Sequence, residues 1–215
     1  MNPTFLPYLD DLDWNDLAGL SRAAHVAFSE LTSDNWAPLA KLLGDLPGDP
    51  QLVEMCESYD FLDKLVLHDA PGRFRIRLHR FRPGYFDRPH NHRWTFASKI
   101  LAGSYQHTLY GADTGFTTAD PADLQPLQIR TERADDWYVL HHTAVHSVTA
   151  EAGTLSLVLR GPAAKDSFRV IDAPTGESFT ALGSRDETPQ QRADKRMTPD
   201  RLTGTIADIL TARPA

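Results

Sequence analysis

The most informative part of this 215-residue chain is the run Gly84-Tyr85-Phe86-Asp87-Arg88-Pro89-His90-Asn91-His92. Side chains two residues apart on a β-strand point to the same face, so its two histidines could close on one metal ion. Helical metal sites instead space their histidines three or four residues apart. The run Trp94-Thr95-Phe96 that follows is rich in strand-favouring residues, and a strand is therefore expected here.

A bare His-x-His pair is weak evidence, because 9 histidines in 215 residues can produce one by chance. Its surroundings sharpen it. A glycine, five residues, His-x-His and Gly103 eleven residues later resemble the first motif of the cupin superfamily. The downstream segment 135–148 resembles the second motif, a strand, a turn and a lone histidine. This resemblance implies that His146 joins His90 and His92 as metal ligands; the alternative is a polar strand edge.

The cupin motif usually carries a glutamate between its second histidine and its distal glycine. Phe96 stands at that position, and no carboxylate occurs from Arg93 to Gly103. The predicted site therefore consists of three neutral imidazoles.

Composition excludes several classes of protein. The net charge of −7 argues against a general nucleic-acid binder, which would show a basic excess. No apolar run approaches the length of a membrane span, and the first residues lack the features of a signal peptide. Cys56 is the only cysteine, so it cannot form an internal disulfide and is expected to pack as a small apolar residue. We expect a cytoplasmic protein without nucleic-acid or membrane partners.

Periodicity divides the chain into three parts. Apolar residues at helical spacing predict helices over 13–31, with Asp13 as N-cap, over 35–46, and from Asp49-Pro50 onward. Strands are predicted at 61–68, 74–79, 90–101, 104–110, 127–132, 136–141, 146–150, 154–160 and 167–172. Residues 173–197 read as irregular, and Thr198-Pro199 begins a last helix whose apolar stripe could dock on the strands or on a second subunit, giving a homodimer.

These elements predict a mainly β fold: a cupin, jelly-roll-like antiparallel β-barrel with N-terminal helices and a C-terminal helix. The expected division is an N-terminal helical region over 1–60, the barrel over 61–172 and a tail with one helix over 173–215.

Helices followed by a barrel resemble the cysteine dioxygenase branch of the cupins. The resemblance covers roughly residues 50–172 and includes the runs Lys99-Ile100-Leu101-Ala102-Gly103, Thr108-Leu109-Tyr110 and Leu155-Ser156-Leu157-Val158-Leu159-Arg160-Gly161-Pro162. Thiol dioxygenases of this type hold iron(II) with three histidines and lack the glutamate. The resemblance therefore implies iron at His90, His92 and His146.

The substrate pocket departs from that family. Asp63 stands where those enzymes carry the arginine that pairs with the substrate carboxylate. Arg160 replaces the tyrosine near the iron, Val158 replaces the histidine that supports it, and Phe96 replaces the cysteine that crosslinks to it. The resemblance thus supports the metal ligands but not cysteine as the substrate.

Three neutral imidazoles leave a bound divalent ion its full charge and about three open positions, which favours a substrate that brings a negative donor. Such sites suit oxygen-activating iron, and imidazoles also suit Zn²⁺ and Ni²⁺. Asp87 is a candidate for orienting a ligand ring, and a turn residue otherwise. His141 or His142 could be an extra ligand or an acid–base group, or both could be turn residues, while the direction of His107 stays undecided.

Arginine recurs at positions 73, 75, 77, 80 and 82. If Arg75 and Arg77 face the barrel they could pair with an anionic substrate; otherwise they form a solvated strand face. Asp63 and Arg160 together suggest a substrate with one cationic and one anionic group, such as an amino-acid derivative. Trp94, Phe96, Tyr105 and Phe81 would be pocket walls or ordinary core residues.

The sequence therefore predicts a mononuclear non-haem iron(II) oxygenase that acts on a small polar metabolite and O2, with Arg160 and Asp63 positioning the substrate. The first alternative is a zinc- or nickel-dependent isomerase or lyase without O2 chemistry. The second is a metabolite-binding cupin without enzymatic activity, for which the sequence shows no output domain.

Overall fold

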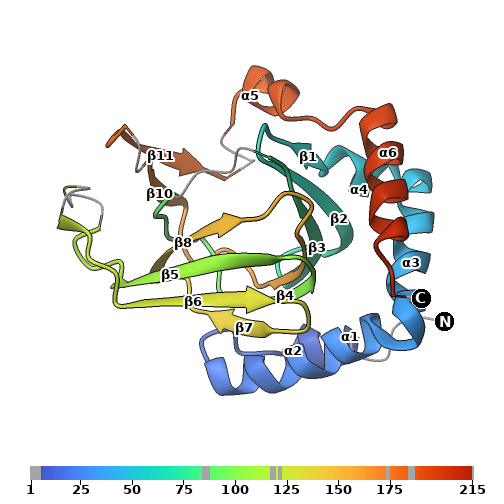
Figure 1. The fold of residues 1–215 in the computed structure, drawn as a ribbon, viewed down its shortest axis with the longest axis horizontal. Helices are drawn as coiled ribbons and strands as arrows, with labels where there is room; N and C mark the ends of the chain where they lie inside the picture. The colour runs from blue at the N-terminus through green and yellow to red at the C-terminus, as the bar shows by residue number, and fades with distance from the viewer. Residues whose placement is uncertain are drawn as a thin grey trace.

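In the computed structural model, which describes residues 6–83, 88–116, 120, 123–172, 175–183 and 187–214, the chain forms three layers (Figure 1). Helices cover one face of a six-stranded sheet, and a three-stranded sheet lies on its other face. All strand pairs are antiparallel. The predicted mainly β fold with helices at both ends is confirmed.

The larger sheet has the strand order β1-β2-β3-β9-β4-β7. Its strands are β1 (Glu57–Ser58), β2 (Leu62–Ala70), β3 (Phe74–Phe81), β9 (Leu155–Arg160), β4 (Phe96–Ala102) and β7 (Trp137–Leu140). The smaller sheet runs β6-β5-β8, with β6 (Gln128–Arg133), β5 (Ser104–Ala112) and β8 (Ala144–Ala150). A separate hairpin pairs β10 (Ser167–Ile171) with β11 (Ser178–Leu182).

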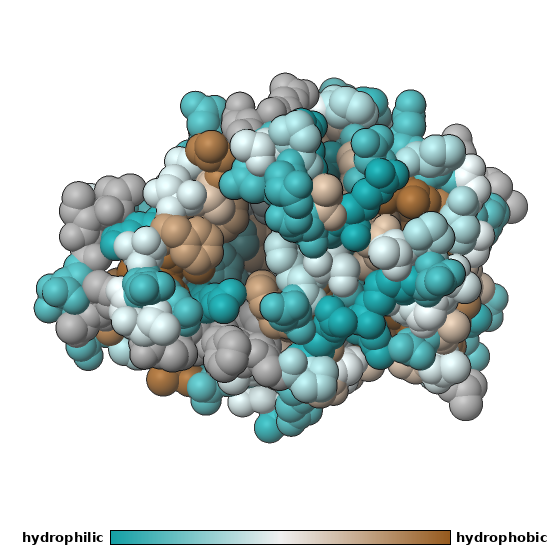
Figure 2. All heavy atoms as spheres, turned by 90° about the horizontal axis from the view of Figure 1, so that it is seen from above, coloured by the Kyte–Doolittle hydropathy of each residue, from teal (hydrophilic) through white to brown (hydrophobic). Residues whose placement is uncertain are grey.

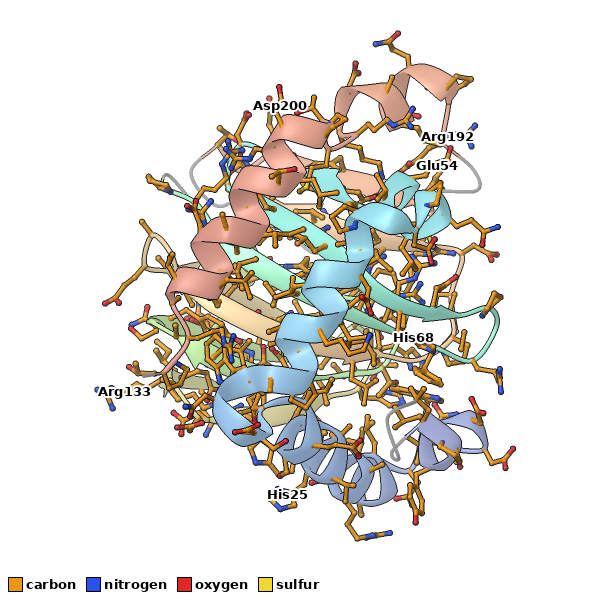
Figure 3. The ribbon with its side chains drawn as sticks, turned by 90° about the vertical axis from the view of Figure 1, so that its right-hand side faces the viewer. His25, Glu54, His68, Arg133, Arg192 and Asp200 are labelled. Carbon is orange, nitrogen blue, oxygen red and sulfur yellow. The ribbon has the colours of Figure 1, made fainter. Side chains whose placement is uncertain are left out.

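Five helical segments precede the sheets: α1 (Leu6–Asp10), α2 (Leu17–Leu31), α3 (Ser33–Asp45), the short 3₁₀ helix η1 (Leu46–Gly48) and α4 (Pro50–Glu54). Asp16 caps α2 by accepting a hydrogen bond from the Ala18 amide, and Asp49 caps α4. Two helices close the chain, α5 (Pro189–Asp194) and α6 (Pro199–Thr211). Figure 3 shows α3 and α6 side by side in front of the sheet.

Alternation along β3 explains why one sheet can serve two layers. Phe74, Ile76 and Leu78 belong to the core that the helices cover. Phe81 belongs instead to the core between the two sheets, together with residues of β4, β5, β7, β8 and β9. Successive strand residues point to opposite faces, so the residues between those apolar ones, Arg75, Arg77 and His79, face the inter-sheet space.

Glycine is required where β4 turns into β5. Gly103 has φ +74°, and a Cβ at this position would lie 2.5 Å from Thr154 Oγ1. Gly103, the predicted distal glycine of the first motif, thus allows the tight turn that joins β4 of the larger sheet to β5 of the smaller one.

Three expectations about elements were wrong, and one short helix was missed. The strand predicted over 90–101 begins only at Phe96; His90 makes an isolated bridge and the chain bends before β4. Asp16 rather than Asp13 is the N-cap of α2. The region 173–197, expected to be irregular, contains β11 and α5. The helix α1 was not predicted, since its five residues are too few to show a periodic pattern.

Figure 2 shows one face of the molecule, which is mainly hydrophilic, carries separate hydrophobic patches and is hollowed to the left of its middle. Within the part of the chain that the structure describes, no helix has both the length and the apolar composition needed to cross a membrane.

Candidate metal centre

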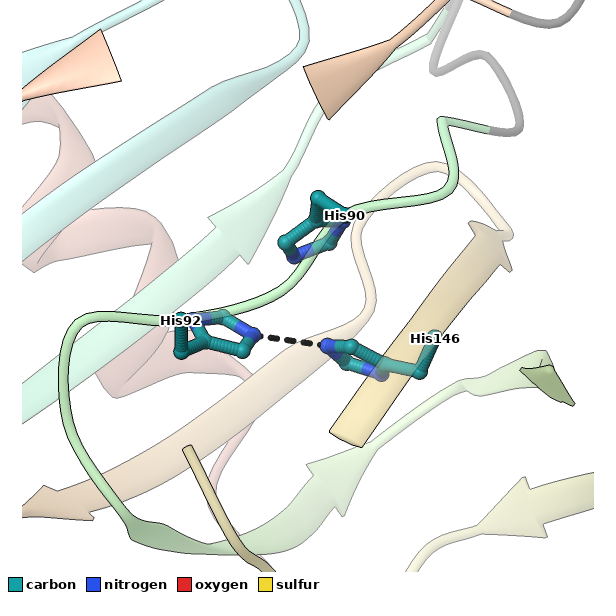
Figure 4. Close-up of side chains that lie close together, drawn as sticks. All are labelled: His90, His92 and His146. Carbon is teal, nitrogen blue, oxygen red and sulfur yellow. Dashed lines mark hydrogen bonds between the residues drawn. The ribbon is translucent and has the colours of Figure 1, made fainter. Parts of the chain in front are cut away.

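The predicted ligands come together from two segments far apart in the chain. The backbones of His90 and His146 exchange two hydrogen bonds, of 2.8 and 2.9 Å, and this bridge fixes the ligand loop against β8. His92 follows two residues later, and its ring points at that of His146 (Figure 4). One nitrogen of each imidazole lies within 4.8 Å of the others, so the three histidines form a group that could hold a metal ion.

The cluster is closed on one side and accessible on the other. His146 is buried, with 3% of its surface exposed, whereas His90 and His92 are half-buried. The ring centroids of His90 lie 4.6 Å from those of both His92 and His146. His146 is thus the innermost of the three ligands.

A backbone carbonyl fixes the proton on His90. Its Nδ1 lies 2.7 Å from the Arg88 carbonyl oxygen, which can only accept a hydrogen bond. Nδ1 must therefore carry the hydrogen. In the neutral ring Nε2 then has its lone pair free, as metal ligation requires.

A longer chain of hydrogen bonds fixes His146 in the same way. His107 Nδ1 lies 3.0 Å from Glu132 Oε1, and its Nε2 lies 2.9 Å from His146 Nδ1. The carboxylate accepts, so neutral His107 carries its hydrogen on Nδ1 and accepts at Nε2 from His146. His146 therefore keeps its Nε2 lone pair for a metal. His107, whose direction the sequence left undecided, orients a ligand.

The third ligand completes the test of whether these residues suit a metal. His92 Nε2 lies 2.7 Å from His146 Nε2, and only one hydrogen can lie between them. Because His146 carries its hydrogen on Nδ1, His92 is the donor. For His92 to bind a metal through Nε2, this hydrogen would have to move to Nδ1 of the same ring, which keeps the imidazole neutral. The donor set fits one metal ion of the type that imidazoles bind.

Burial keeps the ligands neutral. Burial lowers the pKa of His90 to about 4, although its hydrogen bond to Arg88 acts the other way. Burial also lowers the pKa values of His92 and His146 well below the usual range, and the neighbouring histidines act in the same direction. Protons therefore compete for this site only at lower pH than ordinary histidine pKa values suggest.

The residue between the two loop ligands anchors the loop. The Asn91 side chain donates to Asp113 Oδ2 at 2.9 Å and accepts from the Arg169 amide at 2.9 Å. Asp113 also accepts from Lys165 Nζ at 2.6 Å. The buried Asn91 thus ties the loop that carries His90 and His92 to two other segments of the chain.

Aromatic rings line the cluster. Phe96 lies 4.7 Å from His92 and 5.9 Å from His146, measured between ring centroids, and Trp94 lies 5.9 Å from His92. Behind them Tyr105 and Tyr138 join their hydroxyls at 2.7 Å. Phe96, at the position where the cupin motif carries a glutamate ligand, is thus part of an apolar wall beside the histidines.

Basic side chains face the same inter-sheet space. Arg160 and Arg77 lie over Trp94, with their guanidinium carbons 4.9 and 5.5 Å from the ring centroid. Lys64 and His79, which the sequence analysis did not select, are close enough to lower the pKa of His92. His79 could have been found, because it continues the alternation of Arg75 and Arg77.

Asp63 does not join this group. It is fully buried on the other face of the sheet, where Arg201 Nη2 of α6 lies 2.5 Å from its Oδ2 and Ser58 donates to its Oδ1 at 2.8 Å. Leu62 before it faces the inter-sheet core, so parity turns Asp63 toward the helices. The predicted role of Asp63 in positioning the substrate beside Arg160 is therefore corrected. Asp63 anchors α6 on the helix face. Arg160 lies on the opposite face, next to Trp94, which in turn contacts His92.

The other candidates are turn residues. His141 contacts Thr143 Oγ1 at 2.8 Å, and His142 contacts Thr95 Oγ1 at 3.1 Å. Neither belongs to the three-histidine group. Asp87 lies outside the described residues.

Comparisons with known proteins give remote likenesses. No protein-family model matches the sequence, and no curated protein matches it either. KdgF from Halomonas sp. is 17% identical, with a TM-score of 0.38 over 48% of this chain and 82% of its own. An RmlC-like cupin from Shewanella frigidimarina is 16% identical, with a TM-score of 0.37 over 51% of this chain and 96% of its own.

Hydroquinone 1,2-dioxygenase from Sphingomonas sp. TTNP3, solved with 4-hydroxybenzoate bound, is 12% identical, with a TM-score of 0.36 over 46% of this chain and 65% of its own. Scores this low carry no argument about activity.

Proposed function

We propose that this protein is a metal-dependent enzyme of the three-histidine cupin type, and specifically a mononuclear non-haem iron(II) oxygenase acting on a small polar metabolite. The observation that carries the proposal is the histidine cluster, in which hydrogen bonds already fix His90 and His146 with Nε2 free for a metal. The resemblance to the thiol dioxygenases, which lack a carboxylate ligand as this site does, favours iron. When bound, iron(II) would supply the activation of O2 for reaction with the substrate.

The chain's own residues would do the rest. Glu132 and His107 hold the Nδ1 proton of His146, so this ligand cannot turn away from the metal. Phe96 and Trp94 exclude water from one side of the cluster. The substrate would approach on the side of His90 and His92, the two ligands that are only half-buried.

The test is the metal content of untagged protein, expressed with iron and purified anaerobically, and measured by mass spectrometry. We expect iron near one per chain in the parent, none in His146→Ala, and an unchanged amount in His142→Ala. His142 is the matched control, because it lies four residues away in the chain but hydrogen-bonds to Thr95. Substrate-dependent O2 uptake would then follow from a screen of small polar metabolites.

Zinc or nickel retained at that level, with no iron exchange and no O2 uptake, would contradict the oxygenase and favour the isomerase or lyase. Equal metal content in the parent and in His146→Ala would contradict the metal centre itself.

A further inference from the structure

The inner face of the six-stranded sheet carries more positive charge than its acids neutralise. Arg75 stands opposite Arg160 on the neighbouring strand, and Arg77 lies one pair further along the same face. Like charges opposite each other on a sheet destabilise it unless something compensates them. Lys64 lies on the next strand, paired in register with His79.

The acids near these groups are already engaged. Glu57 accepts from Lys195 at 2.7 Å and lies 3.7 Å from Lys64. Asp69 lies 2.6 Å from Arg75. Within the described residues, Arg77 and Arg160 therefore have no carboxylate partner.

The Nε atom of each of these two guanidinium groups also lacks a hydrogen bond. Among the described residues, Arg77 Nε, Arg160 Nε and His79 Nε2 are buried nitrogens without a partner. Arg160 uses Nη1 to donate to the Gly161 carbonyl at 2.9 Å, so its Nε side stays open. Burial and the charge of Arg77 lower the pKa of Arg160 to about 8, which reflects how poorly this charge is compensated. Buried charge without a partner is costly and marks a place for a ligand.

The position of these groups relates them to the metal centre. Trp94 lies between the two, with its ring 5.9 Å from His92 and 4.9 Å from the Arg160 guanidinium carbon. The Arg160 guanidinium and the His92 ring are thus neighbours of the same indole ring. The Nε–Nη edge of a guanidinium matches the planar fork of a carboxylate, and the flat Trp94 ring beside it suits a planar group better than a tetrahedral one.

We propose that Arg77 and Arg160, with His79 and Lys64 beside them, form a carboxylate-binding site, and that the substrate is therefore a small organic acid whose reacting group lies at the metal. This inference rests on the proposed function. It differs from the carboxylate site of the cysteine dioxygenases, whose arginine position is Asp63 here, on the opposite face. Asp63 binds Arg201 on that opposite face, so it is not available to pair with a cationic group of the substrate.

The experiment is calorimetric titration of metal-free protein with benzoate, succinate and inorganic sulfate at low ionic strength. We expect saturable binding of the carboxylates, reduced about tenfold or more in Arg77→Met and Arg160→Met, since each removes a charge-assisted hydrogen bond. Arg77→Lys should lose nearly as much, because it keeps the charge and loses the fork. Arg73→Met is the matched control, since Arg73 pairs with Asp10 outside the site, and it should bind as the parent does.

Carboxylate binding that is unchanged in Arg77→Met and Arg160→Met would overturn the inference. Sulfate binding as tight as succinate would overturn the assignment to carboxylates. Titration of His146→Ala separates this inference from the proposed function, because that variant should lose metal and keep carboxylate binding. Metal content that is normal in Arg77→Met, with no carboxylate binding in the parent, would sink this inference alone.

Discussion

The two faces of the six-stranded sheet treat buried charge in opposite ways. On the helix face, Asp63 is surrounded by donors, with Arg201 at 2.5 Å and Ser58 at 2.8 Å. On the inner face, Arg160 and Arg77 have buried Nε groups without a partner in the described residues. The fold itself supplies hydrogen-bond partners for the Asp63 carboxylate. The Nε groups of Arg77 and Arg160 are left for the proposed ligand. The difference separates a residue that holds the structure from residues that bind.

The largest effect is expected where the charge is satisfied. Arg201→Met leaves Asp63 buried with the Ser58 hydroxyl at 2.8 Å and with two more distant cations, Arg80 and Arg82, at 3.8 and 4.0 Å. Breaking a buried ion pair from one side costs about 3 kcal/mol in the free energy of unfolding. Urea denaturation would measure it, with Arg192→Met on the exposed side of α5 as control. A loss below about 1 kcal/mol would show that α6 does not depend on this contact.

The second effect concerns the metal ligand and not the fold. His107→Phe removes the acceptor for His146 Nδ1, and we expect metal affinity to fall about 10- to 100-fold, as for other residues that orient a ligand. Competition with a chromogenic chelator would measure it. Glu132→Gln keeps a hydrogen-bond acceptor for His107 and should lose less. Equal affinities in the parent and in both variants would contradict the role of this chain of hydrogen bonds.

On the inner face the expected effect on stability is small and can have the opposite sign. Arg160→Met removes a buried charge without a carboxylate partner and keeps much of the side-chain volume. Such replacements are neutral or stabilising, so the free energy of unfolding should stay within about 1 kcal/mol of the parent or rise. Denaturation in urea without added anions would measure it. A loss as large as that of Arg201→Met would mean that Arg160 is a structural residue.

The smallest effect is expected in metal retention near neutral pH. Because burial lowers the pKa of His90 to about 4, and those of His92 and His146 are lowered too, protons do not compete at pH 6. Retention should change less than about twofold between pH 7.5 and 6 and fall as pH approaches 4. Histidines with the unperturbed pKa of about 6.5 would instead lose metal as the pH falls below about 6. Steep loss beginning at pH 6.5 would contradict the expected retention.

The same pKa values affect the metal-free fold. An unfolded chain takes up protons on histidine below about pH 6.5, while the buried rings do not until lower pH. The free energy of unfolding should therefore fall as pH drops from 6.5 toward 4, the value to which the pKa of His90 is lowered. Substituting His90 by Asn should flatten part of that decline.

Much of the site could be predicted, because it depends on local spacing. The two loop histidines and His146 are where the motifs placed them, although the loop ligands do not lie on a regular strand. Two residues of β3, Arg75 and Arg77, could be placed on one face by parity with their apolar neighbours, and only the choice of face was open.

The errors arose where the alternation of apolar and polar residues did not show which face of the sheet a side chain takes. The strand β2 has a bulge between Val66 and His68 and a burial pattern without regular alternation, so nothing in the sequence showed that Asp63 faces the helices. His107 was left undecided, although Tyr105, two residues before it, is buried in the inter-sheet core and shares its face. Glu132 required the pairing of β5 with β6, which involves residues 25 apart and has no local signal.

The wide separation of the metal ligands along the chain also affects how the stability of the protein responds to metal. His92 and His146 are 54 residues apart, and in an unfolded chain they would rarely meet. A metal held by both would act as a crosslink that exists only in the native state. By mass action, free metal at 100 times its dissociation constant would add about 2.7 kcal/mol to the apparent stability. Melting temperature would then depend on metal concentration, and a chelator would act as a mild denaturant of this protein.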